Sequence, residues 1–178
     1  AIADTDSGVN QDSIGVYVDG NQIVVPCVED SEVWLCEFTS DPLAEGDHEF
    51  VFLAADITGN NVTETRYYFV DSNGPVIAGT HVESIGINQM VTAMAEDSLT
   101  SISEAVFYID GNYETPTQME ATDDEFDELF ELVEGEIDIT NLTSDAHWVE
   151  VKAKDEAGNW GELGDPITFY VYRQCEGF

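Results

Sequence analysis

The chain has 178 residues, of which 38 are Asp or Glu and only four are Lys or Arg, so its formal net charge is -34. Such a surface repels nucleic-acid phosphates and anionic lipid headgroups, which excludes both as favourable partners. Because 43% of the residues are hydrophobic and 11% are aromatic, the acidity is that of a folded protein and not of a disordered tail. No apolar run approaches the roughly 18 residues needed to span a bilayer, so we expect no membrane insertion in this segment.

Alternation of apolar and polar residues dominates the chain and predicts β-strands, whereas helical periodicity is scarce. In the first half the expected strands are residues 14–18, 22–25, 48–55 and 65–70. The turn residues Asp19-Gly20-Asn21 join the first two strands. In the second half we expect strands at 76–87, 90–95, 105–109, 136–139, 147–153 and 167–172. The predicted fold class is therefore all-β.

The segment Asp71-Ser72-Asn73-Gly74-Pro75 is rich in residues that end strands, and it predicts a domain boundary. The expected domains are residues 1–73 and residues 74–178. The second domain is longer because of an acidic insertion at 114–136, in which several apolar residues have helical spacing. A solvated acidic loop, a short helix and a strand extension are all open for this insertion.

An internal repeat is the strongest pattern in the sequence. The segment Val16-Tyr17-Val18-Asp19-Gly20-Asn21 recurs as Phe107-Tyr108-Ile109-Asp110-Gly111-Asn112, an offset of 111 − 20 = 91. The segment that begins at His48 and ends in Asp56-Ile57-Thr58-Gly59-Asn60 recurs from His147 to Asn159, an offset of 155 − 56 = 99. Since both ends of each copy match in the same order, the chain is predicted to contain two tandem units.

The segments that carry the repeat resemble the immunoglobulin-like domains of bacterial and archaeal surface proteins. They are Tyr17 to Asn21, His48 to Asn60, Tyr108 to Asn112 and His147 to Asn159. This resemblance implies two tandem immunoglobulin-like β-sandwich domains of about seven strands each, located outside the cell at its surface. The segment from Val70 to Val76 also resembles the calcium-binding linkers of cadherin-type repeats, from which it departs at Ser72 and Gly74.

Comparison of the two copies predicts that the first lacks the opening strand of the second. A strand-like segment at 76–87 precedes the part of the second copy that matches Ala1, and the first copy has no such segment. An exposed sheet edge is a liability that proteins usually cover. Either the chain was cut from a longer protein, or another subunit donates the strand.

Several aspartates are candidate calcium ligands, because calcium takes six to eight oxygens from carboxylates, amides and carbonyls. In an immunoglobulin-like sandwich the loops after the second and sixth strands lie at the end where the chain comes in. We therefore expect Asp71, Asn73, Asp97 and Asp155 to converge, with Asp6 and Asp56 as the equivalents in the first copy. The alternative is that each Asp only bonds to its own turn backbone.

The remaining candidate sites concern covalent modification and binding. Cys27 and Cys36 flank an alternating stretch and are predicted to form a disulfide, which leaves Cys175 unassigned. Two glycosylation triplets begin at Asn61 and Asn141. Trp160 is a candidate contact for carbohydrate or protein, whereas Trp148 is expected in the core.

The sequence contains no nucleophile elbow, phosphate loop or zinc-ligand spacing, so we expect no enzyme activity. The leading interpretation is a structural module of an extracellular surface protein, such as an S-layer, stalk or adhesin segment, with calcium as its one candidate cofactor. A filament subunit that assembles by strand donation is an alternative, and a module that binds carbohydrate or protein is another. The expected partners are neighbouring domains or copies of the same protein, with glycans or a surface protein as further candidates.

The net charge generates the first prediction. Mutual repulsion of the acidic groups destabilises the folded state most at low ionic strength, where screening is weakest. We expect the thermal midpoint to rise when molar salt or divalent ions are added to dilute buffer, measured by circular dichroism. A midpoint that does not change would contradict this interpretation.

Overall fold

The computed structural model describes residues 1–31, 33–85 and 88–172, and all regular structure within them is β-strand. Fifteen strands form four antiparallel sheets in this part of the chain, which confirms the all-β fold class. The chain divides into two compact units, one spanning Ala1–Val70 and the other starting at Asp71. The predicted boundary after residue 73 therefore lies three residues beyond the observed one.

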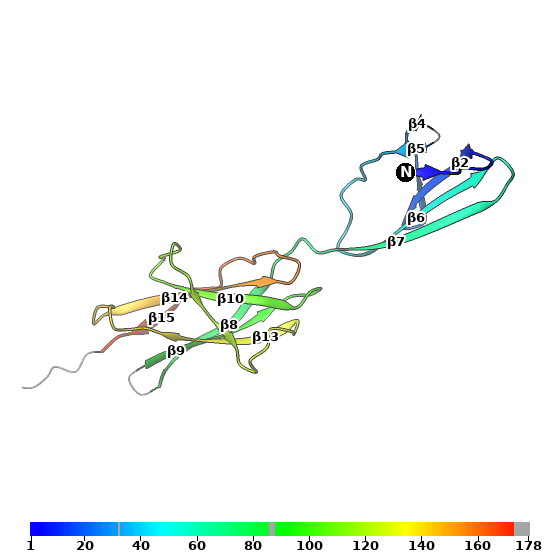
Figure 1. The fold of residues 1–178 in the computed structure, drawn as a ribbon. Coiled ribbons are helices and arrows are strands. Elements are labelled where there is room, and N and C mark those ends of the chain that lie inside the picture. The colour runs from blue at the N-terminus through cyan, green and yellow to red at the C-terminus, as the bar shows by residue number, and fades with distance from the viewer. Residues whose placement is uncertain (32, 86–87, 173–178) are drawn as a thin grey trace, which may run out of the picture. The chain divides into compact units, whose positions relative to one another are not determined.

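The second unit is a sandwich of two four-stranded sheets (Figure 1). One sheet has the order β11 (Thr117–Gln118), β10 (Ile102–Ile109), β14 (Ala146–Asp155) and β15 (Ile167–Tyr170). The other has the order β12 (Glu120–Ala121), β13 (Phe130–Ile137), β9 (Asn88–Glu96) and β8 (Val76–Ile85). Alternate residues of both sheets point inward and form one buried core that includes Val91, Phe107, Val133 and Val151. This period-two burial explains why alternation in the sequence predicted the strands.

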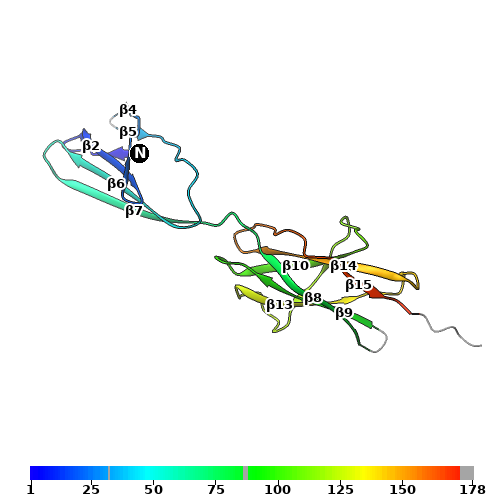
Figure 2. The same cartoon turned by 180° about the vertical axis from the view of Figure 1, so that it is seen from behind.

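The first unit has two sheets whose strand orders match those of the second unit, with one strand fewer in the smaller sheet (Figure 2). Its larger sheet has the order β3 (Asn21–Ile23), β2 (Val9–Val18), β6 (Gly46–Asp56) and β7 (Asn61–Val70). Its smaller sheet has the order β1 (Ile2–Ala3), β5 (Val33–Cys36) and β4 (Cys27–Asp30). The strand β1 lies at the edge of this sheet, because no described strand corresponds to β8 of the second unit.

A disulfide joins Cys27 to Cys36 across the hairpin formed by β4 and β5. The two cysteines are directly opposite each other in the register of these strands. A cross-link of this kind stabilises the fold mainly by restricting the unfolded chain. It therefore supports a unit whose buried hydrophobic residues are few among those described, notably Val16, Val18 and Phe50. The third cysteine, Cys175, lies outside the described residues.

The predicted acidic insertion at 114–136 is too long. The segment includes β11 and β12 and most of β13, and β12 and β13 have counterparts in β4 and β5 of the first unit. The repeat offsets differ by 99 − 91 = 8 residues, so the second unit has only about eight extra residues between its matching ends. The expected strand at 136–139 is likewise displaced, because β13 spans Phe130–Ile137.

Each unit fixes its Asp-Gly turn with a buried histidine from the neighbouring strand. In the second unit His147 Nδ1 lies 2.6 Å from Asp110 Oδ2, and His147 Nε2 lies 3.0 Å from the carbonyl oxygen of Thr143. In the first unit His48 Nδ1 lies 2.7 Å from Asp19 Oδ2, and its Nε2 lies 2.7 Å from the Ala44 carbonyl oxygen. Because both ring nitrogens face acceptors, the ring is satisfied only when both nitrogens carry a proton.

These contacts raise the pKa of both histidines above the ordinary value of 6.5. For His147 the main cause is the hydrogen bond with Asp110, and for His48 it is the hydrogen bond with the Ala44 carbonyl, followed by that with Asp19. Asp19 and Asp110 have positive φ angles of 49° and 53°, as the central residues of these tight turns require. The histidine therefore holds a strained turn in place from the next strand.

The histidine contacts generate a pH prediction. Because the folded-state pKa is raised, the stabilisation is complete below about pH 6.5 and is lost as pH rises through the folded-state pKa. We expect His147→Gln, which cannot be charged, to lower the thermal midpoint of the second unit by several degrees at pH 6 and by less at pH 9. The measurement is tryptophan fluorescence in a Trp34→Phe background, where only Trp148 and Trp160 report. An equal loss at both pH values would contradict a charged histidine.

Candidate metal centre

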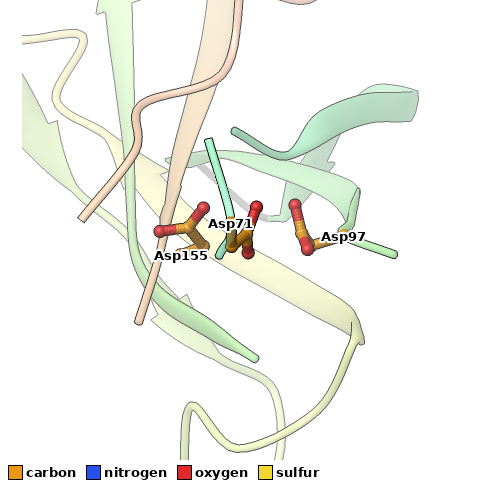
Figure 3. A group of neighbouring side chains, drawn as sticks. All are labelled: Asp71, Asp97 and Asp155. Atoms are coloured by element: carbon orange, nitrogen blue, oxygen red, sulfur yellow. The ribbon is translucent and has the colours of Figure 1, made fainter. Parts of the chain in front are cut away.

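Three aspartates from distant parts of the sequence converge at one end of the second unit (Figure 3). Asp71 is the first residue of the unit, Asp97 directly follows β9, and Asp155 is the last residue of β14. One carboxylate oxygen from each lies within 4.8 Å of the others. Three of the four residues predicted to meet here are therefore brought together.

Two glycines allow the segment that carries Asp71 to lie against the turn after β14. A side chain at Gly74 would clash with the backbone of Trp160 and Gly161, and a side chain at Gly161 would clash with the backbone of Pro75. The two backbones approach each other closely only because both residues lack a Cβ atom. The side-chain amide of Asn159 also donates a hydrogen bond of 3.1 Å to the Asp71 carbonyl oxygen. The backbone of Asp71 is thus anchored to the second unit through its carbonyl oxygen and through the residues that follow it.

Local hydrogen bonds hold each carboxylate in one orientation. Asp97 Oδ1 accepts from the backbone N–H groups of Leu99, at 2.8 Å, and Thr100, at 3.0 Å. Asp155 accepts from the backbone N–H of Asn159 at 2.7 Å and from its side-chain amide at 3.0 Å. The Thr100 hydroxyl donates to Asp71 Oδ2 at 2.6 Å and so links two of the three aspartates through the turn after β9.

These bonds show that the aspartates do organise their own turns, which was the alternative interpretation of the sequence. They do not explain why three turns place their carboxylates side by side. Asp97 and Asp155 are only 6% and 1% exposed, so water screens their charges poorly. Within the described part of the chain, no Lys, Arg or His lies within 4 Å of any of the three carboxylates.

The convergence is costly unless a cation is present. Two unit charges about 5 Å apart repel by on the order of 3 kcal/mol at an effective dielectric constant of about 20. A cation among the three carboxylates reverses the sign of that energy. All the potential ligands are oxygens, which suits a hard cation such as calcium, whereas zinc favours the nitrogen and sulfur of His and Cys.

The other predicted ligands lie differently. Asn73 is exposed, and its backbone N–H donates to Asp71 Oδ1 at 3.3 Å. In the first unit Asp6 is exposed, and its backbone N–H donates to Asp4 Oδ1 at 2.8 Å. Asp56 Oδ2 accepts from Ser7 and Thr58, both at 2.9 Å, and also from Asn60. Among the described residues, no acidic group of three forms in the first unit.

Hydrogen bonds account for the charge state of Asp56 without any cation. The Asn60 side chain is the main cause of a pKa far below the ordinary range for this carboxyl group, and the Asn60 backbone, Thr58 and Ser7 contribute. Asp56 therefore corresponds to Asp155 in sequence, and each accepts a hydrogen bond from the backbone N–H four residues further along. The Oδ2 atom of Asp56, however, also accepts hydrogen bonds from the hydroxyl groups of Ser7 and Thr58. In the first unit this position behaves as a turn residue.

The surface candidates have the following positions. Trp160 is partly exposed, and the ammonium groups of Lys152 and Lys154 lie 5.7 and 5.9 Å from its ring centroid. Two of the four basic residues of the chain thus lie over this ring at cation–π distance. The expectation that Trp148 lies in the core is wrong, because its side chain is exposed and packs near Gly111. The glycosylation candidates Asn61 and Asn141 are both exposed.

One buried carboxyl group was not anticipated. Glu131 is only 2% exposed, and its Oε2 atom has no hydrogen-bond partner. Burial raises its pKa, and the nearby charges of Asp123 and Glu128 act in the same direction, against the backbone N–H groups of Glu128 and Asp127. The alternation of the sequence could have predicted this burial, because Glu131 lies two residues before the buried Val133 on the same face of β13.

No protein-family model matches the chain, and no curated protein is significantly similar to it. None of the described residues forms a helix long and apolar enough to cross a membrane. The function is therefore inferred from the geometry of the chain itself.

Glu131 generates a stability prediction. Since its folded-state pKa is raised, the charged carboxylate costs stability that is absent at low pH and grows as pH rises through the folded-state pKa. We expect Glu131→Gln to raise the thermal midpoint of the second unit by about 2–5 °C at pH 7.5 and to have little effect at pH 4. The matched control is Glu136→Gln, an exposed position on the same strand, which removes one charge without relieving burial. An equal rise in both variants would assign the effect to general repulsion.

Proposed function

We propose that this chain is a non-catalytic structural module of an extracellular surface protein, built from two tandem immunoglobulin-like units, in which calcium fixes the start of the second unit. The observation that carries the proposal is the convergence of the Asp71, Asp97 and Asp155 carboxylates within 4.8 Å. Two of them are buried, and a carboxylate is costly to bury without a compensating charge. A bound cation supplies that charge.

The position of the site supports a mechanical role. Asp71 follows directly after the first unit, whereas Asp97 and Asp155 belong to strand ends of the second sandwich. A cation that joins these three residues attaches the connecting segment to two separate strands, one in each sheet of the sandwich. Binding therefore restricts the backbone at the point where one unit passes into the next.

The chemistry of the group favours holding an ion over turning over a substrate. Asp97 and Asp155 accept hydrogen bonds from their own turns and are nearly closed to solvent. A catalytic carboxylate has to reach a substrate, either directly or through one water molecule. Buried, locally bonded carboxylates fit a structural ion, for which extracellular modules typically have dissociation constants of about 0.1–1 mM.

Three further features support an extracellular setting. A disulfide joins Cys27 and Cys36, and such bonds persist mainly in oxidising compartments. Both glycosylation triplets begin at exposed asparagines. The net charge of -34 favours a milieu that supplies cations. These features support the surface location as part of the proposal.

Calcium titration tests the proposal. At a few millimolar calcium we expect saturable binding by calorimetry and a rise in the thermal midpoint of the second unit on the order of 5 °C. Sodium chloride at matched ionic strength separates site binding from general screening of the acidic surface. The second unit is followed by tryptophan fluorescence in the Trp34→Phe background.

The key variant is Asp97→Asn, because an amide oxygen can still accept the bonds from Leu99 and Thr100. We expect this variant to lose the calcium response while matching or exceeding the wild-type midpoint in calcium-free buffer. The matched control is Asp56→Asn in the first unit, which should retain the response of the second unit. A calcium-induced shift of equal size in Asp97→Asn and wild type would overturn the proposed site.

A further inference from the structure

In the second unit, the sheet formed by β11, β10, β14 and β15 has one face toward the core and one face outward. Along β14 the buried His147 and Val149 flank Trp148, so the Trp148 ring points outward and is 41% exposed. On β15 Phe169 is buried in the same way, and the next residue, Tyr170, points outward and is 54% exposed. Because side chains alternate along a strand, these two rings lie on the outward face.

The strand register makes these two rings neighbours. Trp148 pairs with Thr168, and Tyr170 lies two residues further along β15. The rings are therefore diagonal neighbours on adjacent strands, a relation in which side chains are about 7–8 Å apart and aromatic rings can touch. Tyr170 in turn stacks on the exposed Tyr172, with ring centroids 6.1 Å apart and an angle of 18° between the ring planes.

Two tyrosines extend this surface on the side of Trp148 that faces β10. A Cβ atom at Gly111 would lie 3.7 Å from the Trp148 ring and 4.0 Å from the Tyr113 hydroxyl oxygen, so the two side chains meet at this glycine. Tyr113 packs edge-on against Tyr108 of β10, with ring centroids 5.3 Å apart. We call the five rings the aromatic patch: Tyr108, Tyr113, Trp148, Tyr170 and Tyr172.

Carboxylates lie among the rings of the aromatic patch. The Tyr113 hydroxyl donates a hydrogen bond of 2.8 Å to Glu150 Oε2, and Glu150 pairs with Tyr108 in the strand register. Asp110 Oδ1 accepts the backbone N–H of Trp148 at 3.1 Å. A cation over one of these rings would therefore also lie near a negative charge.

The described part of the chain supplies no such cation to the aromatic patch. The ammonium groups of Lys152 and Lys154 lie 5.7 and 5.9 Å from the centroid of a different ring, Trp160. Arg66 belongs to the first unit, and Arg173 lies outside the described residues. Trp160 thus has the pairing of ring and cation that the aromatic patch lacks among the described residues.

We propose that the aromatic patch binds a basic segment of a partner protein, whose arginine side chains stack on the rings and pair with the neighbouring carboxylates. A guanidinium group is planar, so it can lie flat on an aromatic ring and bind a carboxylate through two N–H groups. The net charge of -34 favours a cationic partner over an acidic one. Asp155 lies at the other end of β14 from Trp148, so the inference does not rest on the calcium site.

The internal repeat indicates which unit carries this surface. The equivalent face of the first unit also has tyrosines, Tyr17 and Tyr67, but Glu49 occupies the position of Trp148. The Tyr67 hydroxyl donates to Glu49 Oε1 at 3.1 Å. The central ring of the aromatic patch is therefore present only in the second unit, to which we assign the binding.

A peptide of four Gly-Arg repeats tests the proposal on the full chain, at about 0.15 M salt, where screening limits long-range attraction. We expect calorimetry to detect binding, and the fluorescence of Trp148 to change in a Trp34→Phe, Trp160→Phe background, where it is the only tryptophan. A peptide of four Gly-Lys repeats has the same charge and should bind about threefold more weakly, because an ammonium group cannot stack flat. Absence of binding at millimolar Gly-Arg peptide, or equal affinity for the two peptides, would overturn the proposal.

Three variants that leave the net charge unchanged localise the binding. We expect Trp148→Ala and Tyr170→Ala each to weaken binding of the Gly-Arg peptide about fivefold, because each removes a ring on which a cation stacks. The matched control is Phe130→Ala, which removes a ring that is 57% exposed on the other sheet of the same unit and should leave the affinity unchanged. Wild-type affinity in both patch variants, or the same loss in all three, would contradict the assignment.

A neutral oligosaccharide tests the other class of occupant that exposed aromatic rings can accept. We expect maltohexaose at millimolar concentration neither to bind nor to displace the Gly-Arg peptide, because it offers no charge to Glu150 and Asp110. Binding of maltohexaose that Trp148→Ala abolishes, together with no binding of the peptide, would overturn the proposal in favour of a carbohydrate site.

Discussion

The inward face of a β-sheet has to be covered along its whole width if its apolar side chains are to be buried. The edge strands determine whether the outermost part of that face is covered. In the second unit this condition is met, because β8 extends one sheet beyond β9 and reaches across to β14 and β15. Inward residues such as Val91, Val149 and Ala153 are then fully buried. Where the equivalent strand is missing from the described first unit, the same architecture leaves Val62 and Tyr68 uncovered. Both the buried core of the second unit and the exposed residues of β7 follow from this single constraint.

Closure of the second sandwich also determines where its charges meet. Strands β9 and β14 belong to opposite sheets, yet they end at the same end of the sandwich, so Asp97 and Asp155 approach each other. Asp71 joins them because β8 must begin beside the end of β9, and the glycine contact between Gly74 and Gly161 brings its backbone close. Asp71 lies shortly before β8, the strand that closes the core. Pairing of β8 with β9 therefore brings Asp71 close to Asp97. In the first unit Asp56 has its turn contacts but no described counterpart of Asp71.

The sequence predicted the parts of this structure that depend on period and on repetition. Alternation of apolar and polar residues predicted the long strands, and the two repeat offsets identified the equivalent turns of the two units. The topology of an immunoglobulin-like sandwich then predicted that Asp71, Asp97 and Asp155 would lie close together. The acidic segment 114–136 was misjudged because its many carboxylates obscured the alternation that buries Ala121, Glu131 and Val133. Burial of Glu131 and exposure of Trp148 depend on which face of a strand meets the core. A shift of one residue reverses that choice.

The two units therefore differ in how the charges of their carboxylates are balanced. The second unit has a complete core and an uncompensated group of charges, which a small cation neutralises at little steric cost. The first unit has satisfied carboxylates, as at Asp56, which accepts hydrogen bonds from Ser7 and Asn60. Because the hydrogen bonds of Asp56 lie within the first unit, the calcium that we propose would act on the second unit alone.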